Sequence, residues 1–294
     1  DHNLISPLMR VVTGFVIGTG VIVAGLILSG KGYEVTVQKL CAAGISILYS
    51  DIFACRAVYD FISPEVAFPL MTLVTVTSCL LAIRLDSKYV ALLGLIGGFM
   101  TPPLLSTGID RPLALFAYCA MLDIGLAAVA FRKDWSFLIP LSALATFIME
   151  MGWTLKFFTV DKSWTAVTIY LFFPLLFIVL SRIAEQKKKA DILFSVPADF
   201  LCLISMGFAA NFLSFPSLGA RPGLVMTFLF LLNLLLSYRV VRSDDARPIH
   251  LISGIATFFF LWNWTSRYLT QELLMLGLFF IMAFAILHMV LPIV

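Results

Sequence analysis

Residues 7–29 read PLMRVVTGFVIGTGVIVAGLILS, and after Arg10 this stretch holds no charged side chain. An α-helix rises about 1.5 Å per residue, so about 20 consecutive apolar residues are enough to cross the hydrocarbon core of a bilayer. The stretch therefore predicts a transmembrane helix.

Apolar runs of this kind recur along the whole chain of 294 residues. The composition is 61% hydrophobic and only 13% charged, and the mean hydropathy is +1.02. Soluble domains hold about 45–50% apolar and about 25% charged residues. The sequence therefore predicts an all-α protein, a polytopic transmembrane helical bundle. Its eleven candidate spans cover residues 7–29, 36–60, 66–84, 88–106, 112–131, 136–157, 164–181, 192–215, 222–241, 248–268 and 271–292.

We expect one transmembrane domain over residues 1–294, with the polar residues of the spans gathered in its first half, 1–157, and a more apolar second half, 158–294. Alternate loops assign 13 of the 20 Lys and Arg residues to one side of the membrane and 7 to the other. The richer side is expected to be cytoplasmic. This places Asp1 in the periplasm and Val294 in the cytoplasm. The first residue is Asp rather than Met, and the N-terminus is expected on the outer side of the membrane. We therefore expect one further span upstream, making about 12 in the full-length protein.

The segment 97–103, GGFMTPP, interrupts the fourth run. Glycine lowers helix propensity, and each proline lacks a backbone N–H and disfavours helix in the residue before it. We therefore expect non-helical chain at Thr101–Pro103, with the freed carbonyl groups of Gly98 and Phe99 accepting from Arg56, Thr101 or water. Two interpretations stay open: a broken helix buried in the bundle, which is typical of transporter sites, or a helix that simply ends there.

Charged residues inside the spans are the other candidates for function. A charge at the bilayer centre costs about 2.5–3.5 kcal/mol on insertion scales, so a retained one usually faces a cavity or a partner. Asp51, Asp123 and Glu150 are expected at similar depths, and Arg56 about one turn further out, within reach of Asp60 four residues on. The candidate transport cavity comprises Asp51, Arg56, Asp123, Glu150, Gly97, Gly98, Thr101 and Pro102. The alternative is a set of interhelical hydrogen bonds that holds the bundle together.

Other polar residues and the glycines favour structural interpretations. Ser195 and Pro197 have the pattern of a helix start, which would place Asp199 near the cytoplasmic interface. The GxxxG spacings, at Gly14 and Gly18 and at Gly94 and Gly98, are typical of close helix packing. The cysteines (Cys41, Cys55, Cys79, Cys119 and Cys202) all lie in apolar runs and are expected to pack as small hydrophobic residues.

Catalytic and metal-binding patterns are missing from the sequence. It holds no Walker loop, HExxH, GxSxG or GxGxxG motif, and His288 has no second histidine at the spacing of metal ligands, since His2 and His250 lie at a terminus and an interface. We predict no metal, no cofactor and no catalytic residue. The basic residues are scattered and form no cluster of the kind that binds nucleic acid. The expected partners are membrane lipids and other membrane or envelope proteins.

Residues 92–108, LLGLIGGFMTPPLLSTG, resemble the signature of a bacterial membrane family, domain of unknown function 2339. Leu4–Phe15, Ala42–Tyr59 and Arg111–Trp135 are similar to family segments at the same relative places, so the resemblance covers about residues 4–157. Pro103 departs from the single proline of the family pattern. The resemblance implies a polytopic inner-membrane protein with a cytoplasmic, coil-prone N-terminal region and one further helix. It carries over no activity and no site residues.

Three functions fit these features. The first is a transporter or channel-like protein for a small solute, with the buried acids in its pathway. The second is a non-catalytic membrane scaffold or envelope-assembly subunit. The third is a membrane-embedded lipid-modifying enzyme, which the short loops disfavour, so a non-enzymatic role is the stronger expectation.

Overall fold

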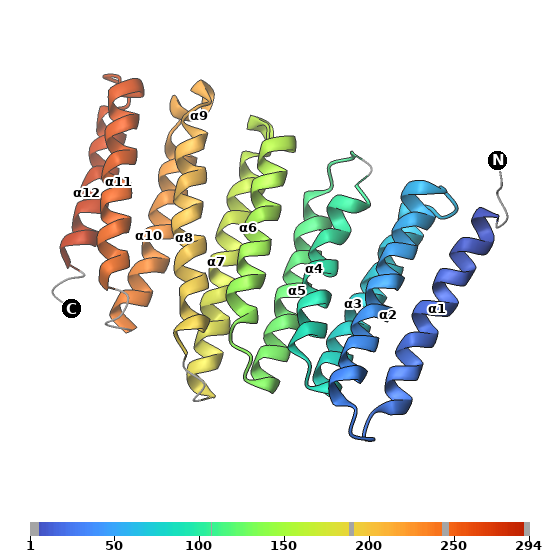
Figure 1. The fold of residues 1–294 in the computed structure, drawn as a ribbon. Helices are drawn as coiled ribbons and strands as arrows, with labels where there is room; N and C mark the ends of the chain where they lie inside the picture. Colours follow the sequence, from blue (N-terminus) through green and yellow to red (C-terminus); the bar gives the residue numbers. More distant parts are fainter. Residues whose placement is uncertain (1–5, 107, 188–190, 243–246, 291–294) are drawn as a thin grey trace. The chain divides into compact units, whose positions relative to one another are not determined.

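The computed structural model of the protein describes residues 6–106, 108–187, 191–242 and 247–290. Every regular element in these ranges is a helix, which confirms the all-α prediction (Figure 1). The long helices are α1 (Pro7–Leu28), α2 (Glu34–Phe53), which runs on into a π-helical turn (Ala54–Val58), α3 (Pro64–Leu85), α4 (Lys88–Leu104), α5 (Pro112–Lys133), α6 (Leu138–Phe157), α7 (Ser163–Gln186), α8 (Ile192–Phe212), α10 (Gly223–Arg242), α11 (Arg247–Tyr268) and α12 (Leu274–Val290). A 3₁₀ turn, Val160–Lys162, precedes α7, and the one-turn helix α9 (Pro216–Gly219) precedes α10.

Each predicted span corresponds to one of these long helices, with ends that differ by a few residues. Among the described residues, eight helices are long and apolar enough to cross a membrane, namely α1, α2 with its π-helical turn, α3, α5, α6, α7 with its 3₁₀ turn, α8 and α10. Helices α4 and α12 are shorter, at 17 residues each. The polytopic helical architecture is confirmed.

Local sequence signals set several helix ends. The Ser6 hydroxyl accepts a hydrogen bond from the Met9 amide at the start of α1, where Pro7 supplies a backbone already suited to the first turn. Helices α3 and α5 each end at an aspartate in the left-handed conformation, Asp86 with φ 51° and Asp134 with φ 56°. Aspartate tolerates this conformation better than most residues. The turns that follow are therefore tight, and the chain reverses at once.

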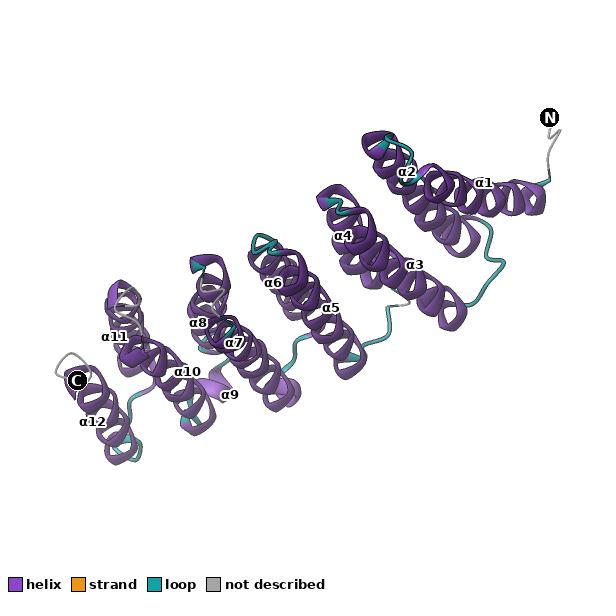
Figure 2. Ribbon diagram, turned by 90° about the horizontal axis from the view of Figure 1, so that it is seen from below, coloured by secondary structure: helices purple, strands orange, loops and turns teal. Residues whose placement is uncertain are grey.

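The chain divides into two compact units, residues 1–146 and residues 147–294. In the first unit, α1, α3 and α5 lie in one layer and α2 and α4 in a second (Figure 2). In the second unit, α7, α10 and α12 form one layer and α8 and α11 the other (Figure 2). Helix α3, for example, contacts α5 in its own layer and both α2 and α4 in the opposite one.

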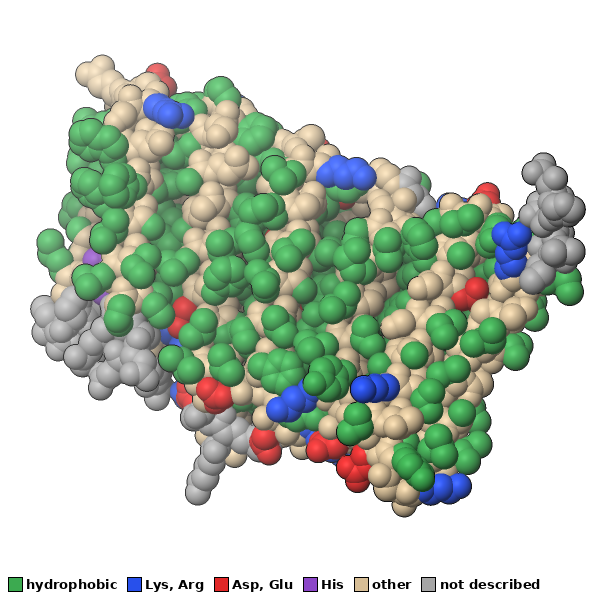
Figure 3. Space-filling model, in the orientation of Figure 1, with side chains coloured by type: hydrophobic (Ala, Val, Ile, Leu, Met, Phe, Trp, Pro, Cys, Tyr) green, Lys and Arg blue, Asp and Glu red, His purple; other side chains and the backbone are tan. Residues whose placement is uncertain are grey.

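Hydrophobic side chains cover the visible helix surfaces, and charged side chains lie mostly toward the helix ends (Figure 3). Helix α1 is the extreme case, since only 17% of its span is buried. Such an apolar surface is suited to contact with the hydrocarbon chains of lipids. Of the five cysteines, four are buried and Cys79 is half-buried, as predicted for small core residues.

Glycines allow α1 and α2 to approach closely, as their spacing predicts. A Cβ at Gly18 would lie 3.0 Å from the Leu48 side chain, and one at Gly44 would lie 2.7 Å from the Gly18 carbonyl oxygen. Glycines at such contacts permit backbone-to-backbone packing of membrane helices.

Candidate functional site

Asp51 lies on the face of α2 that packs against α1. A Cβ at Gly14 would lie 2.4 Å from Asp51 Oδ1, so the carboxyl group occupies space that only a glycine leaves open. The carboxyl group is half-buried, and its Oδ2 has no hydrogen-bond partner among the described residues. This acid therefore belongs to the contact between α1 and α2.

Arg56 lies in the π-helical turn that follows α2 and forms an ion pair with Asp60, as the spacing of four residues predicts. Asp60 is in the left-handed conformation, with φ 52°, where the chain leaves the turn. The guanidinium group is thus engaged at the helix end, and no hydrogen bond joins it to the end of α4 in the described part of the chain.

The predicted break at Thr101–Pro103 is wrong. Helix α4 runs from Lys88 to Leu104 with both prolines in its last turn. A proline costs most in a helix interior, where it removes a hydrogen bond and its ring clashes with the carbonyl four residues earlier. Close to the C-terminus few hydrogen bonds remain to be lost, so the helix tolerates the two rings.

The prediction that freed carbonyl groups need donors is confirmed at Gly98, but the donor is different. Pro102 cannot donate to the Gly98 carbonyl, which instead accepts a 3.0 Å hydrogen bond from the Tyr118 hydroxyl of α5. The Thr101 hydroxyl donates to the Gly97 carbonyl at 2.8 Å. Both tyrosine and threonine are buried. The end of α4 is therefore held by a side chain of the next helix.

Tyr49 of α2 completes the polar contacts around α4. Its hydroxyl lies 2.7 Å from that of Thr75 in α3, and its ring fills the space beside Gly97, where a Cβ would come within 2.3 Å. Thr75 in turn donates to the Met71 carbonyl at 2.9 Å. Gly97 therefore leaves room for the ring of Tyr49 from α2, and Gly98 accepts the hydrogen bond of Tyr118 from α5.

Asp123 lies at the middle of α5 and is fully buried. Its Oδ2 accepts a 2.8 Å hydrogen bond from the hydroxyl of Thr146 in α6, whereas Oδ1 has no partner among the described residues. Ser142, one turn earlier in α6, lies close to the same carboxyl group and is also fully buried. Among the described acidic residues of the first unit, Asp123 is the one that is fully buried.

The structure does not bring the predicted acids of the first unit together. Asp51 faces α1, whereas Asp123 faces α6, and α3 and α4 lie between them (Figure 2). Glu150 belongs to the second unit, where it is fully buried; its backbone carbonyl accepts from Thr154, whose hydroxyl is also bonded to that of Tyr170. Asp51 and Asp123 were expected at similar depths in the membrane, but they do not share a site.

The predicted helix start at Ser195 is wrong. Helix α8 begins at Ile192 with Asp191 as its N-cap, so Asp199 lies two turns inside the helix and is only 5% exposed. Arg239 of α10 binds it through two hydrogen bonds, Nε to Oδ1 and Nη2 to Oδ2, both 3.1 Å. A third, longer contact of 3.5 Å joins Arg239 to the hydroxyl of Ser181 in α7. The sequence feature that could have indicated this pair is the presence of an acid, Asp199, and a base, Arg239, in two spans of the second half.

Histidines 38 positions apart meet in the second unit. Nδ1 of His288 lies 3.4 Å from Nε2 of His250, and the ring centroids are 4.8 Å apart. His250, expected at an interface, is 8% exposed. The described residues hold no group of three His, Cys, Asp or Glu side chains suited to a metal ion.

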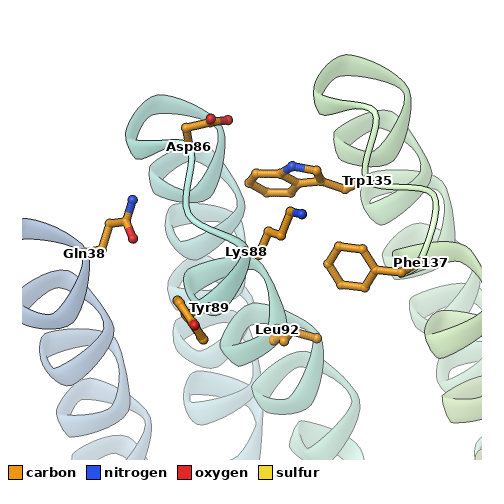
Figure 4. A pocket seen from close by; sticks show the side chains of 7 residues that line it. All are labelled: Gln38, Asp86, Lys88, Tyr89, Leu92, Trp135 and Phe137. Carbon is orange, nitrogen blue, oxygen red and sulfur yellow. The ribbon is translucent and has the colours of Figure 1, made fainter. Parts of the chain in front are cut away.

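Two hollows open at the ends of α3 and α5 in the first unit. One, of about 420 Å³, is lined by Gln38, Asp86, Lys88, Tyr89, Leu92, Trp135 and Phe137. Figure 4 shows Lys88 directed toward Phe137, and its Nζ lies 5.9 Å from the centre of that ring. The other, of about 530 Å³, is lined by Leu80, Ile83, Arg84, Arg132 and Lys133. A 2.9 Å ion pair between Lys133 and Asp86 joins the two hollows.

The long apolar helices and the polar contacts buried between them define a polytopic helical membrane protein. The chain belongs to the family described as predicted membrane protein (DUF2339), whose model matches residues 1–293. The family match thus extends well beyond residues 4–157. No curated protein and no solved structure matches the chain.

Proposed function

We propose that the protein carries a small solute across the membrane, and that the Asp123 carboxyl group binds and releases a proton in the transport cycle. The observation that supports this is the environment of Asp123: mid-span, fully buried, and with one oxygen lacking a hydrogen bond among the described residues. Carboxyl groups retained at such positions serve as proton relays in pumps and transporters.

The site is smaller than the sequence predicted. It consists of Asp123 and the two hydroxyl groups of α6, Thr146 and Ser142. Asp51 and Glu150 are separate candidates, each with its own neighbours, and a role for them in the same pathway remains part of the proposal. The Gly97–Pro102 segment positions α4 against Tyr118 rather than lining this site.

Asp123→Asn tests the proposal because the amide has the shape of the carboxyl group and cannot exchange a proton. Uptake of a panel of radiolabelled amino acids, sugars, organic acids and inorganic ions is measured in membrane vesicles with and without the protein. We expect at least one solute whose uptake needs the protein, falls with a protonophore, and is lost in D123N at unchanged protein level. Asp161→Asn, the same change at an exposed acid before α7, is the matched control and should transport normally.

A second candidate function is a membrane scaffold. The observation that favours it is the pairing of polar groups between helices: Tyr49 with Thr75, Asn233 with Thr257, and Arg239 with Asp199. Under this function Asp123 is one more such contact. No solute would then need the protein for its uptake, and D123N would unfold at the same or a slightly higher temperature than the wild type, because no carboxyl group would have to be buried.

The membrane and its orientation also belong to the proposal. We place the chain in a bacterial inner membrane with Asp1 periplasmic and Val294 cytoplasmic, on the distribution of Lys and Arg in the sequence. Residues 188 and 189 of the lysine triplet and residues 1–5 lie outside the described ranges.

A further inference from the structure

The hollow between the C-terminal turns of α3 and α5 has an unusual concentration of positive charge. Of its five lining residues, three are basic: Arg84 from α3, and Arg132 and Lys133 from α5. Like charges around one hollow repel one another. An anion bound among them would remove this repulsion.

The basic residues are only partly neutralised by the protein itself. Lys133 pairs with Asp86 at 2.9 Å. Neither Arg84 nor Arg132 has an ion-pair partner among the described residues. Both lie in the last turn of a helix, where the helix dipole favours a cation. That effect accounts for a basic residue on each helix, but not for the shared hollow of about 530 Å³ between them.

The other side of the hollow is apolar. Leu80 lies one turn before Arg84 on α3 and is 63% exposed, and Ile83 is half-buried beside it. The hollow therefore runs from a guanidinium-lined end to a hydrocarbon-lined end over one helical turn. A soluble anion would use only the first end, whereas a phospholipid would use both.

We propose that this hollow binds the headgroup of an anionic phospholipid, with the phosphate between Arg84 and Arg132 and the first acyl carbons against Leu80. Guanidinium groups match the geometry of phosphate oxygens through two parallel hydrogen bonds. Basic pockets between transmembrane helices recur as lipid headgroup sites. The Lys133–Asp86 ion pair fixes the third cation at the edge of the site.

Native mass spectrometry of the full chain in detergent tests the site, with phosphatidylglycerol and phosphatidylcholine titrated separately. The variant R84Q/R132Q keeps a polar side chain at both positions and removes both charges. Each basic side chain near a bilayer surface contributes about fivefold to binding, so the double variant should bind phosphatidylglycerol about 25-fold more weakly. The matched control R111Q/R267Q removes two exposed arginines elsewhere and should bind like the wild type.

A third variant, Leu80→Gln, separates lipid from free phosphate, because it alters only the apolar end. We expect weaker binding of phosphatidylglycerol, with glycerol 3-phosphate unable to displace the lipid. The proposal is overturned if R84Q/R132Q binds phosphatidylglycerol as the wild type does, if phosphatidylcholine binds equally well, or if glycerol 3-phosphate displaces the lipid completely. These measurements need no transport activity, so they stand apart from the test of Asp123.

Discussion

The guanidinium group of Arg239 meets the carboxylate of Asp199 side by side, through two hydrogen bonds of 3.1 Å, between helices α10 and α8. The exposed fractions of the two side chains are 6% and 7%. A planar, bidentate pair is the strongest arrangement open to these groups, and burial makes each member depend on the other.

Arg239→Gln should therefore destabilise the protein by about 3–5 kcal/mol, because it leaves the Asp199 carboxylate buried without its charge partner. Thermal unfolding in detergent measures the loss. R267Q, which changes an exposed arginine at the end of α11, should shift the stability by less than about 0.5 kcal/mol. The double variant D199L/R239M should recover most of the stability, and a double variant as unstable as R239Q would refute the ion-pair explanation.

Tyr118→Phe should cost about 1–3 kcal/mol, because the Gly98 carbonyl would lose its donor in a buried position. Pro102→Ala supplies a backbone N–H that can donate to the same carbonyl through the ordinary helical hydrogen bond. Y118F/P102A should accordingly be more stable than Y118F alone. Tyr89→Phe, at a side chain that is 73% exposed, is the control and should be neutral. If P102A recovers nothing in the Y118F background, Tyr118 does not act through the carbonyl freed by the proline.

Gly44→Ala and Gly20→Ala should change stability in opposite directions. A Cβ at Gly44 would lie 2.7 Å from the Gly18 carbonyl oxygen, a backbone atom that can move only if α1 and α2 separate. We expect a loss of about 1–3 kcal/mol, as for other overpacked contacts. At Gly20 nothing lies within 4 Å, so alanine should gain about 0.5–1 kcal/mol from helix propensity. Denaturation of the two variants side by side decides the matter, and equal effects would contradict close packing of α1 on α2.

The orientation can be tested with S6C and K187C, because both side chains are exposed. Four native cysteines are buried and Cys79 is half-buried, which keeps the background low. A membrane-impermeant maleimide should label S6C in intact cells and K187C only after permeabilisation. The reverse pattern would invert the topology.

The sequence alone predicted the helices and their approximate ends because these depend on local properties. A run of about 20 apolar residues makes a spanning helix wherever it is placed, since lipid offers the backbone no other hydrogen-bond partners. The Arg56–Asp60 pair followed from a spacing of four residues, and the close approach of α1 and α2 from the Gly14–Gly18 spacing. None of these features needs knowledge of a distant residue.

Tertiary structure decided which polar group meets which. In a membrane, hydropathy does not separate the face of a helix that meets lipid from the face that meets another helix, because both are apolar. The sequence could therefore place Asp51 and Asp123 at one depth, but not on opposite sides of α3 and α4. It showed that Pro102 frees a carbonyl, but not that Tyr118, 20 residues away from Gly98, would donate to it. The pairing of Asp199 with Arg239, 40 residues apart, likewise depends on how α8 and α10 turn toward each other, and only the packing of the helices fixes that rotation.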